Sequence, residues 1–171
     1  MSNDTITGRL RVDDGKGIVQ VSGLYRTDID DLWSALTEPE RLSRWLATVD
    51  GHPTPGDTFS ATFTSSWEGQ LRVDACEAPH HLVLTSGVGE PDEAIIEAWL
   101  TAESDGTRLV IEERGFTLDE YAAHGAGWQA HIEDLDSYLS HRENRDWSGR
   151  WSELIPDYNS QAAALASPGQ R

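Results

Sequence analysis

The chain has 171 residues, a length at which one hydrophobic core and one domain are expected. Thirty acidic residues against thirteen basic ones give a formal net charge of −17, which disfavours binding to nucleic acid and to anionic membrane surfaces. No stretch approaches the roughly 20 consecutive apolar residues that a membrane-spanning helix needs. The single cysteine, Cys76, can form no intramolecular disulfide, and residues 1–10 lack the pattern of a secretory signal. We therefore expect a cytoplasmic protein without a membrane span.

The chain begins with a polar segment and then a strand followed by two short helices. Residues 1–16 are rich in Gly and Asp, and we interpret them as a flexible N-terminal arm or a short edge strand. Residues 18–25 are rich in β-forming side chains and predict a strand. After Asp28, which can cap a helix, apolar residues recur at three- and four-residue spacing up to Leu36. Pro39 suits the first turn of a second helix, which we expect to carry Leu42, Trp45 and Leu46.

Five further strands are predicted in the middle of the chain, where apolar and polar residues alternate with period two. These strands are residues 58–64, 67–74, 82–85, 94–102 and 108–116. Asp105 and Gly106 indicate a tight hairpin between the last two. Because such short connections join antiparallel neighbours, the strands should form an antiparallel sheet.

Near Ala122 the hydrophobic period changes from two to three or four, which predicts a long helix over residues 127–140. Its apolar stripe consists of Trp128, Ile132, Leu135 and Leu139. We place the main domain at residues 17–141. Aromatic residues at helical spacing predict a C-terminal helical extension at residues 142–171, with a disordered tail beyond Ala166. The elements together predict an α+β fold of the helix-grip type, in which a curved antiparallel sheet surrounds the long C-terminal helix.

Four segments carry a resemblance to a known family: residues 31–39, 77–82, 106–116 and 127–139. Together they resemble the heat-shock-protein-90 ATPase activator homologues (AHSA-like), within the SRPBCC superfamily that includes START and Bet v-like proteins. The resemblance implies a helix-grip fold, often dimeric, with a cavity between the sheet and the long helix. Members of the superfamily include lipid carriers, polyketide cyclases, hormone receptors and co-chaperones, so the fold alone does not name a reaction. Ser86-Gly87 and Glu113 depart from the pattern expected of relatives, which reshapes the expected pocket.

Two titratable residues are candidates for pocket chemistry. Glu113 shares strand parity with Leu109 and Ile111, so we expect an inward-facing carboxylate with a raised pKa or with a cation such as protonated His131. The alternative is a solvated strand end. His131 lies beside Ile132 on the long helix, where it could orient a ligand carbonyl or act as a general base. The alternative for His131 is a boundary residue that bonds to a neighbour.

Aromatic and aliphatic residues on the inner faces of these elements are the predicted ligand-binding set. The set is Trp45, Phe59, Phe63, Trp67, Leu84, Ile111, Phe116, Trp128 and Ile132. Packing of an ordinary core explains the same residues equally well. Trp99 has the opposite strand parity to its apolar neighbours, which predicts an outward position at a dimer interface.

Motifs for cofactor or metal chemistry are scarce. The sequence has no Gly-rich phosphate loop, no nucleophile elbow and no cysteine pair. His124 and His131 are seven residues apart, but nothing supplies the further ligands of a zinc site, so we predict no metal and no cofactor.

Three hypotheses of function remain. The first is a protein that binds a small hydrophobic, lipid- or polyketide-like molecule in an internal cavity. The second is a cyclase- or dehydratase-like enzyme that uses Glu113 and His131. The third is a co-chaperone-like interaction domain whose acidic surface meets a basic partner.

Overall fold

The protein is built around one eight-stranded sheet. The computed structural model describes residues 6–166. Within that range the strands are β1 (Thr7–Asp13), β2 (Lys16–Tyr25), β3 (Ala47–Val49), β4 (Thr58–Phe63), β5 (Glu68–Glu77), β6 (His81–Ser86), β7 (Ala94–Glu103) and β8 (Gly106–Phe116). The helices are α1 (Ile29–Thr37), α2 (Pro39–Leu42), α3 (Tyr121–Leu139) and α4 (Trp147–Ala166). None of these helices is long and apolar enough to cross a membrane.

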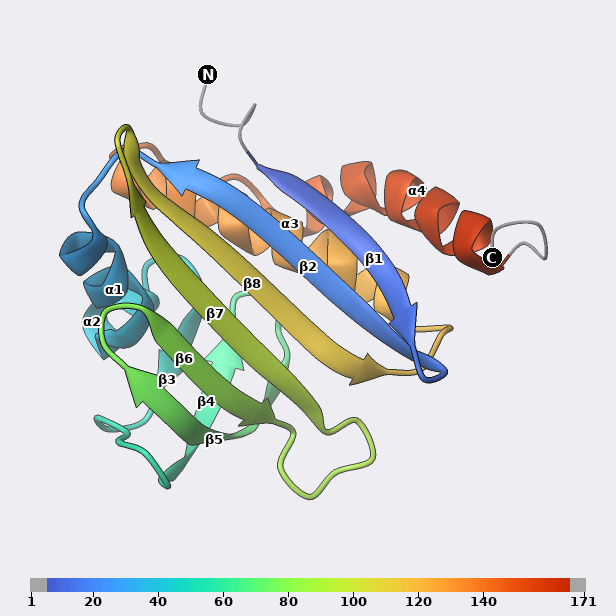
Figure 1. Ribbon diagram of the computed structural model, residues 1–171, viewed down its shortest axis with the longest axis horizontal. Coiled ribbons are helices and arrows are strands. Elements are labelled where there is room, and N and C mark those ends of the chain that lie inside the picture. The colour runs from blue at the N-terminus through green and yellow to red at the C-terminus, as the bar shows by residue number, and fades with distance from the viewer. Residues whose placement is uncertain (1–5, 167–171) are drawn as a thin grey trace.

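The strands follow the order β1-β2-β8-β7-β6-β5-β4-β3, and every neighbouring pair is antiparallel. The sheet curves, and α3 crosses its inner side (Figure 1). The predicted α+β helix-grip fold is thereby confirmed. The sequence prediction missed β3, which has only three residues and no room for a visible alternation.

The first two helices form much as their sequence signals indicate. Asp28 caps α1, and its side chain accepts a hydrogen bond from the backbone N–H of Asp31 at 2.8 Å. Pro39 opens α2, which ends already at Leu42. Trp45 therefore lies in the turn after α2 rather than in the helix, where it is fully buried and donates its indole N–H to the carbonyl of Ala35 at 3.0 Å.

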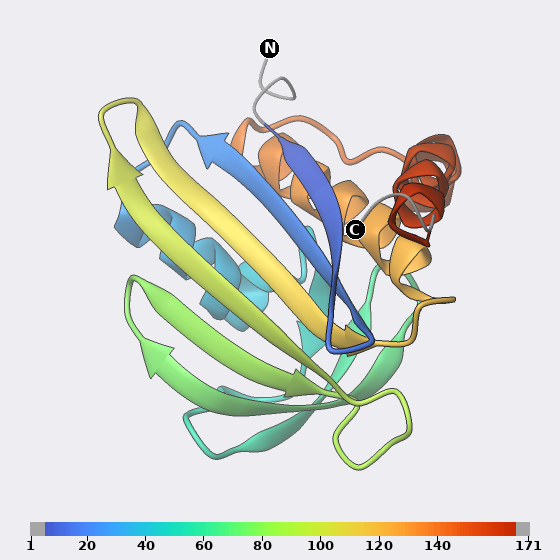
Figure 2. The ribbon, with the colours of Figure 1, turned by 45° about the vertical axis from the view of Figure 1, so that its right-hand side comes forward.

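Helix α3 is buried on more than one side. It begins at Tyr121, earlier than the predicted residue 127, because its first turns also pack inside the molecule. One side faces the sheet, and the opposite side faces α4 (Figure 2). Acidic residues that a surface helix would expose are consequently buried, among them Glu133, which is paired with Arg145 and Arg150. Because α4 covers this second side, more of α3 is buried than the apolar stripe in the sequence predicted.

Both ends of the described chain pack against each other. Part of the segment interpreted as an arm forms edge strand β1, which pairs with β2 over its whole length; the expected flexibility of residues 1–5 lies outside the described residues. Gln161 of α4 bonds to this edge, since its side chain accepts from the N–H of Leu10 at 2.8 Å and donates to the carbonyl of Gly8 at 3.3 Å. Figure 2 shows α4 beside β1. The helix has 20 residues and continues through Pro156, so it is longer than the short helix expected; the predicted tail after 166 lies outside the described residues.

Candidate functional site

A pocket of about 380 Å³ lies between the inner side of the sheet and the two C-terminal helices. Its walls come from the β4–β5 turn, from β6, β7 and β8, and from the facing sides of α3 and α4. The lining residues are Phe63, Ser65, Trp67, Ser86, Asp92, Ile96, Glu113, Phe116, Ala123, His124, Gly127, Trp128, His131, Trp147 and Trp151. A second hollow of about 70 Å³ lies deeper in the core under α1 and α2, and its lining is apolar.

Glu113 is the acid of the pocket. Neighbouring residues of a strand point to opposite faces, so Glu112 lies on the outer face while Glu113 points inward and is only 6% exposed. Its Oε1 accepts a hydrogen bond from the indole Nε1 of Trp128 at 2.6 Å, and its Oε2 accepts one from the hydroxyl of Ser86 at 3.1 Å. Within residues 6–166 Glu113 forms no salt bridge.

Burial raises the pKa of Glu113 to about 7. The two hydrogen bonds act in the opposite direction, since they stabilise the carboxylate, whereas the negative charge of Asp92 raises the pKa further. Glu113 is therefore a group that is part protonated and part ionised near neutral pH. The inward position expected from strand parity is observed, but the partners are Trp128 and Ser86 rather than a cation.

His131 is enclosed by aromatic rings. The centroid of its ring lies 5.8 Å from that of Phe63, 5.7 Å from that of Trp128 and 5.3 Å from that of Trp147. Its Nδ1 is 3.4 Å from the hydroxyl of Thr64. Burial lowers the pKa of His131 to about 3, so the imidazole is uncharged at neutral pH. Of the two alternatives expected for an inward Glu113, the raised pKa is the one observed, and pairing with a protonated His131 is not.

Several pocket residues were missed in the sequence. The ring of His124 stacks on Phe116 at a centroid distance of 4.2 Å, and burial lowers the pKa of His124. Its seven-residue spacing from His131 was the signal that both share one helix face. Ser86 was noted only as a departure from the family pattern, not as a partner of Glu113. Asp92 gave no signal, because the loop after β6 meets the site only when the sheet is assembled.

Helix α4 contributes two tryptophans to the wall of the pocket. The sequence suggested only that Trp147 and Trp151 dock the C-terminal segment. Trp151 does so by donating its indole N–H to the carbonyl of Ala123 at 2.9 Å. The indole Nε1 of Trp147 is buried and has no acceptor among the described residues. The four-residue spacing of Trp147 and Trp151 indicated that they share one face of a helix. It did not indicate that this face would line a pocket.

The predicted ligand-binding set is divided between the two hollows. Phe63, Trp67, Phe116 and Trp128 line the larger pocket. Trp45, Phe59, Leu84 and Ile111 line the smaller one, together with Phe63 and Trp128, and Ile132 is fully buried and lines neither. The strand residues of the set point inward as their alternation indicated, and their role in ligand binding stays a prediction. Alternation does not tell which stretch of a curved sheet stays open.

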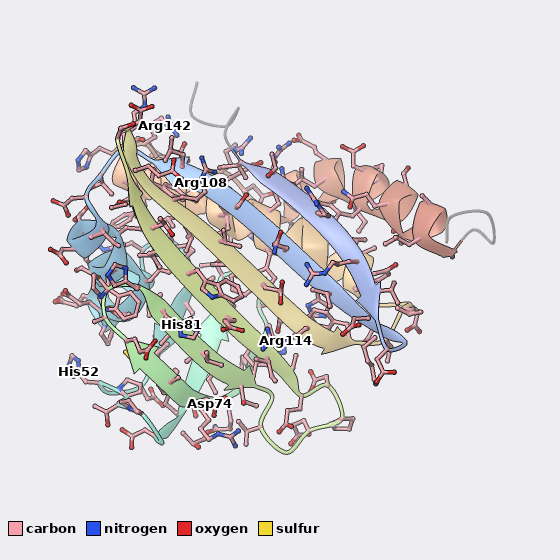
Figure 3. The ribbon with its side chains drawn as sticks, in the orientation of Figure 1. His52, Asp74, His81, Arg108, Arg114 and Arg142 are labelled. Carbon is pink, nitrogen blue, oxygen red and sulfur yellow. The ribbon has the colours of Figure 1, made fainter. Side chains whose placement is uncertain are left out.

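The outer face of the sheet carries charged residues. His81 bonds to Glu97 at 2.5 Å, and Arg114 pairs with Glu97 at 2.9 Å and with Glu112 at 3.2 Å. Figure 3 shows His81 and Arg114 on the face opposite α3. Trp99 stacks on His81 in this layer, with centroids 5.9 Å apart, and its proposed place in a dimer interface stays a prediction. In the described part of the chain no three His, Cys, Asp or Glu residues are grouped so that they could hold a metal ion.

A curved antiparallel sheet that closes on one long helix, with a pocket between them, defines the helix-grip class of protein. The chain belongs to the family of activator of Hsp90 ATPase homolog 1-like proteins, because the model of that family matches residues 26–140. Strands β1 and β2 and the whole of α4 lie outside the matched range. The tryptophans of α4 are therefore a part of the pocket that the family match does not cover.

Solved structures have the same fold. The crystal structure of CalU16 from Micromonospora echinospora has a TM-score of 0.72 at 20% identity, covering 92% of this chain and 96% of CalU16. Protein MLL2253 from Mesorhizobium loti has a TM-score of 0.66 at 26% identity, covering 72% of this chain and 97% of the other. DynU16, from the dynemicin biosynthetic locus, has a TM-score of 0.70 at 25% identity over 79% of this chain, but the match spans only 51% of DynU16. None of the curated proteins matches the sequence.

Proposed function

We propose that the protein binds a small, largely hydrophobic aromatic molecule in the pocket between the sheet, α3 and α4. The observation that carries the proposal is the pocket itself, about 380 Å³ of space with aromatic walls. That volume falls within the roughly 300–1,000 Å³ of pockets that hold drug-sized ligands. Protein interiors otherwise close to crystal-like density, so a hollow of this size is more than a packing fault.

The polar groups of the pocket support the same function. Apolar sites usually carry a few polar groups that orient the ligand, and here these are Glu113, His131 and Trp147. The buried indole N–H of Trp147 has no acceptor among residues 6–166, and leaving such a donor unsatisfied is unfavourable. An oxygen atom on the ligand would satisfy it. The origin of DynU16 in a biosynthetic locus fits a small-molecule ligand, although it describes that protein and not this one.

Binding can be tested with native mass spectrometry and fluorescence. Native spectra of the purified protein report any retained small molecule, and N-phenyl-1-naphthylamine serves as an uncharged aromatic probe whose emission rises in an apolar site. We expect saturable binding of one probe per chain. Ala123 is an exposed residue at the pocket wall, so Ala123→Trp should block the site with little effect on the core. Ala164→Trp, an exposed alanine of α4 away from the lining, is the matched control. The proposal would be refuted if the purified protein retains no small molecule and the probe binds equally well to both variants.

One observation favours a second function. A buried acid with a pKa near 7 on the wall of a pocket is suited to proton transfer, as a cyclase- or dehydratase-like enzyme requires. Uncharged His131 lines the same pocket and can hydrogen-bond a substrate, but burial lowers its pKa to about 3 and makes it a weak base, so in this function Glu113 carries the proton. In this function a bound molecule leaves chemically changed, so mass spectrometry of the ligand before and after incubation distinguishes it from simple binding. A role as a co-chaperone partner and the expected homodimer stay predictions.

A further inference from the structure

The charges around the pocket indicate what kind of ligand it accepts. Two acidic residues line it: Glu113 at the inner wall and Asp92 on the loop between β6 and β7. The basic side chains of the lining are His124 and His131 of α3, and burial lowers the pKa of both below the usual value for histidine. Within residues 6–166 no Lys or Arg lines the pocket. A ligand therefore meets negative charge and no positive charge there.

The arginines near the pocket in the sequence are directed elsewhere. Arg114 follows Glu113 directly, but it lies on the outer face of the sheet, where it pairs with Glu97 and Glu112 (Figure 3). Arg150 precedes Trp151 of the pocket wall, but its guanidinium is held by Glu133 at 2.6 Å. The fold thus keeps these cations away from the carboxylate of Glu113.

The carboxylate of Glu113 also has unused capacity as an acceptor. An ionised carboxylate offers about four lone-pair sites, and Trp128 and Ser86 each supply one donor. These two neutral donors orient the carboxylate but do not neutralise it. A cation brought by the ligand would supply the missing charge, and the net charge of −17 would raise the local concentration of cationic ligands.

We propose that the pocket selects an aromatic molecule that carries a protonated amine, which pairs with the carboxylate of Glu113, and that it rejects ligands that carry a carboxylate, such as fatty acids. This inference rests on the proposed function and specifies its ligand class. Pairing with an ammonium ion favours ionised Glu113, so binding of the amine displaces the proton that the acid holds. Affinity for the amine should consequently rise as the pH passes through 7. Asp92, His124 and His131 are the other titratable groups that line the pocket around Glu113.

Three probes with one ring system test the proposal: 2-(1-naphthyl)ethylamine, 2-(1-naphthyl)ethanol and 1-naphthylacetic acid. Isothermal titration calorimetry at pH 5.5, 7 and 8 gives the affinity of each. With a pKa of about 7, the ionised fraction of Glu113 rises roughly 30-fold between pH 5.5 and pH 8, which sets the upper limit for the gain in amine affinity. We expect the affinity for the amine to rise roughly tenfold or more between pH 5.5 and pH 8. At pH 8 the carboxylic acid should bind at least about tenfold more weakly than the amine.

Variants separate the role of Glu113 from general electrostatics. Glu113→Gln should bring the amine-to-alcohol affinity ratio close to one and remove its dependence on pH. Glu112→Gln is the matched control, since it removes an equal charge one residue away on the outer face, and the ratio should stay as in the unmodified protein. Equal binding of the acid and the amine, or a ratio unaffected by Glu113→Gln, would overturn the proposal. If the alcohol binds but the amine is not preferred, only the ligand class is wrong; if no probe binds, the proposed function itself fails.

Discussion

Replacing Glu113 by glutamine should stabilise the protein more at high pH than at low pH. Burial raises the pKa of Glu113 from 4.5 to about 7, so the folded state holds a proton that the unfolded chain releases. Because the pKa of this acid is higher in the folded protein, the free energy of unfolding falls as the pH rises from the unfolded-state pKa to the folded-state pKa. Above the folded-state pKa it no longer changes through this group. Between pH 5 and pH 8 this loss amounts to about 2–3 kcal/mol. Glutamine fills the same space without titrating, so the variant avoids the loss.

Urea unfolding followed by tryptophan fluorescence at pH 5, 6, 7 and 8 measures the difference in free energy of unfolding between the variant and the unmodified protein. That difference should shift in favour of the variant by about 2–3 kcal/mol over the range. Other groups with altered pKa values, such as Asp134 and His131, are present in both proteins, and their contributions cancel. Glu112→Gln, which removes ion pairs with Arg11 and Arg114, should show no gain that grows with pH. A flat difference for Glu113→Gln, or a shift against the variant, would refute the reasoning.

Three further predictions concern α4 and the pocket wall. Gly8→Ala would place a methyl group 1.6 Å from the hydroxyl oxygen of Tyr158, so the Tyr158 side chain or α4 must shift; we expect thermal unfolding to show a loss of about 1–3 kcal/mol, and unchanged stability would contradict the packing. Glu133→Gln removes the buried carboxylate that pairs with Arg145 and Arg150 and leaves Arg150 only the exposed Glu153; it should cost about 2 kcal/mol and speed hydrogen exchange in α4, whereas exchange that stays slow would show that the buried pair does not hold the helix. Trp147→Phe removes one N–H and should weaken an oxygen-bearing aromatic probe about tenfold, with no change for a plain hydrocarbon. Calorimetry with both probes checks this, and an equal loss for both would point to a change of shape.

The hydrophobic period of the sequence was enough to predict features that depend on a single strand or helix. The parity of Leu109, Ile111 and Glu113 placed the carboxylate inside, because β8 is regular enough that every second residue keeps one face. The change of period near Ala122 predicted α3 for the same reason. Where α3 begins could not be read in this way, because its first turns are held by contacts with distant parts of the chain.

The site as a whole depends on contacts between distant segments. Ser86 reaches Glu113 across β7, and Trp147 reaches His131 across the gap between α3 and α4. The hydrophobic pattern within one segment does not predict which distant residues it will contact. The raised pKa of Glu113 follows from that assembly, and so does the absence of charge on His131, which the sequence had suggested as a cationic partner.

The same carboxylate links stability to binding. At pH 8 the ionisation of Glu113 lowers the free energy of unfolding by about 3 kcal/mol relative to a protein without this titration. An ammonium group in contact with the carboxylate would offset this loss, but only in the bound state. The stabilisation produced by 2-(1-naphthyl)ethylamine should therefore grow between pH 5.5 and pH 8, while the stabilisation produced by the alcohol should not. Melting temperatures with each ligand at both pH values measure this difference, and an equal shift for both ligands would mean that Glu113 does not pair with the amine.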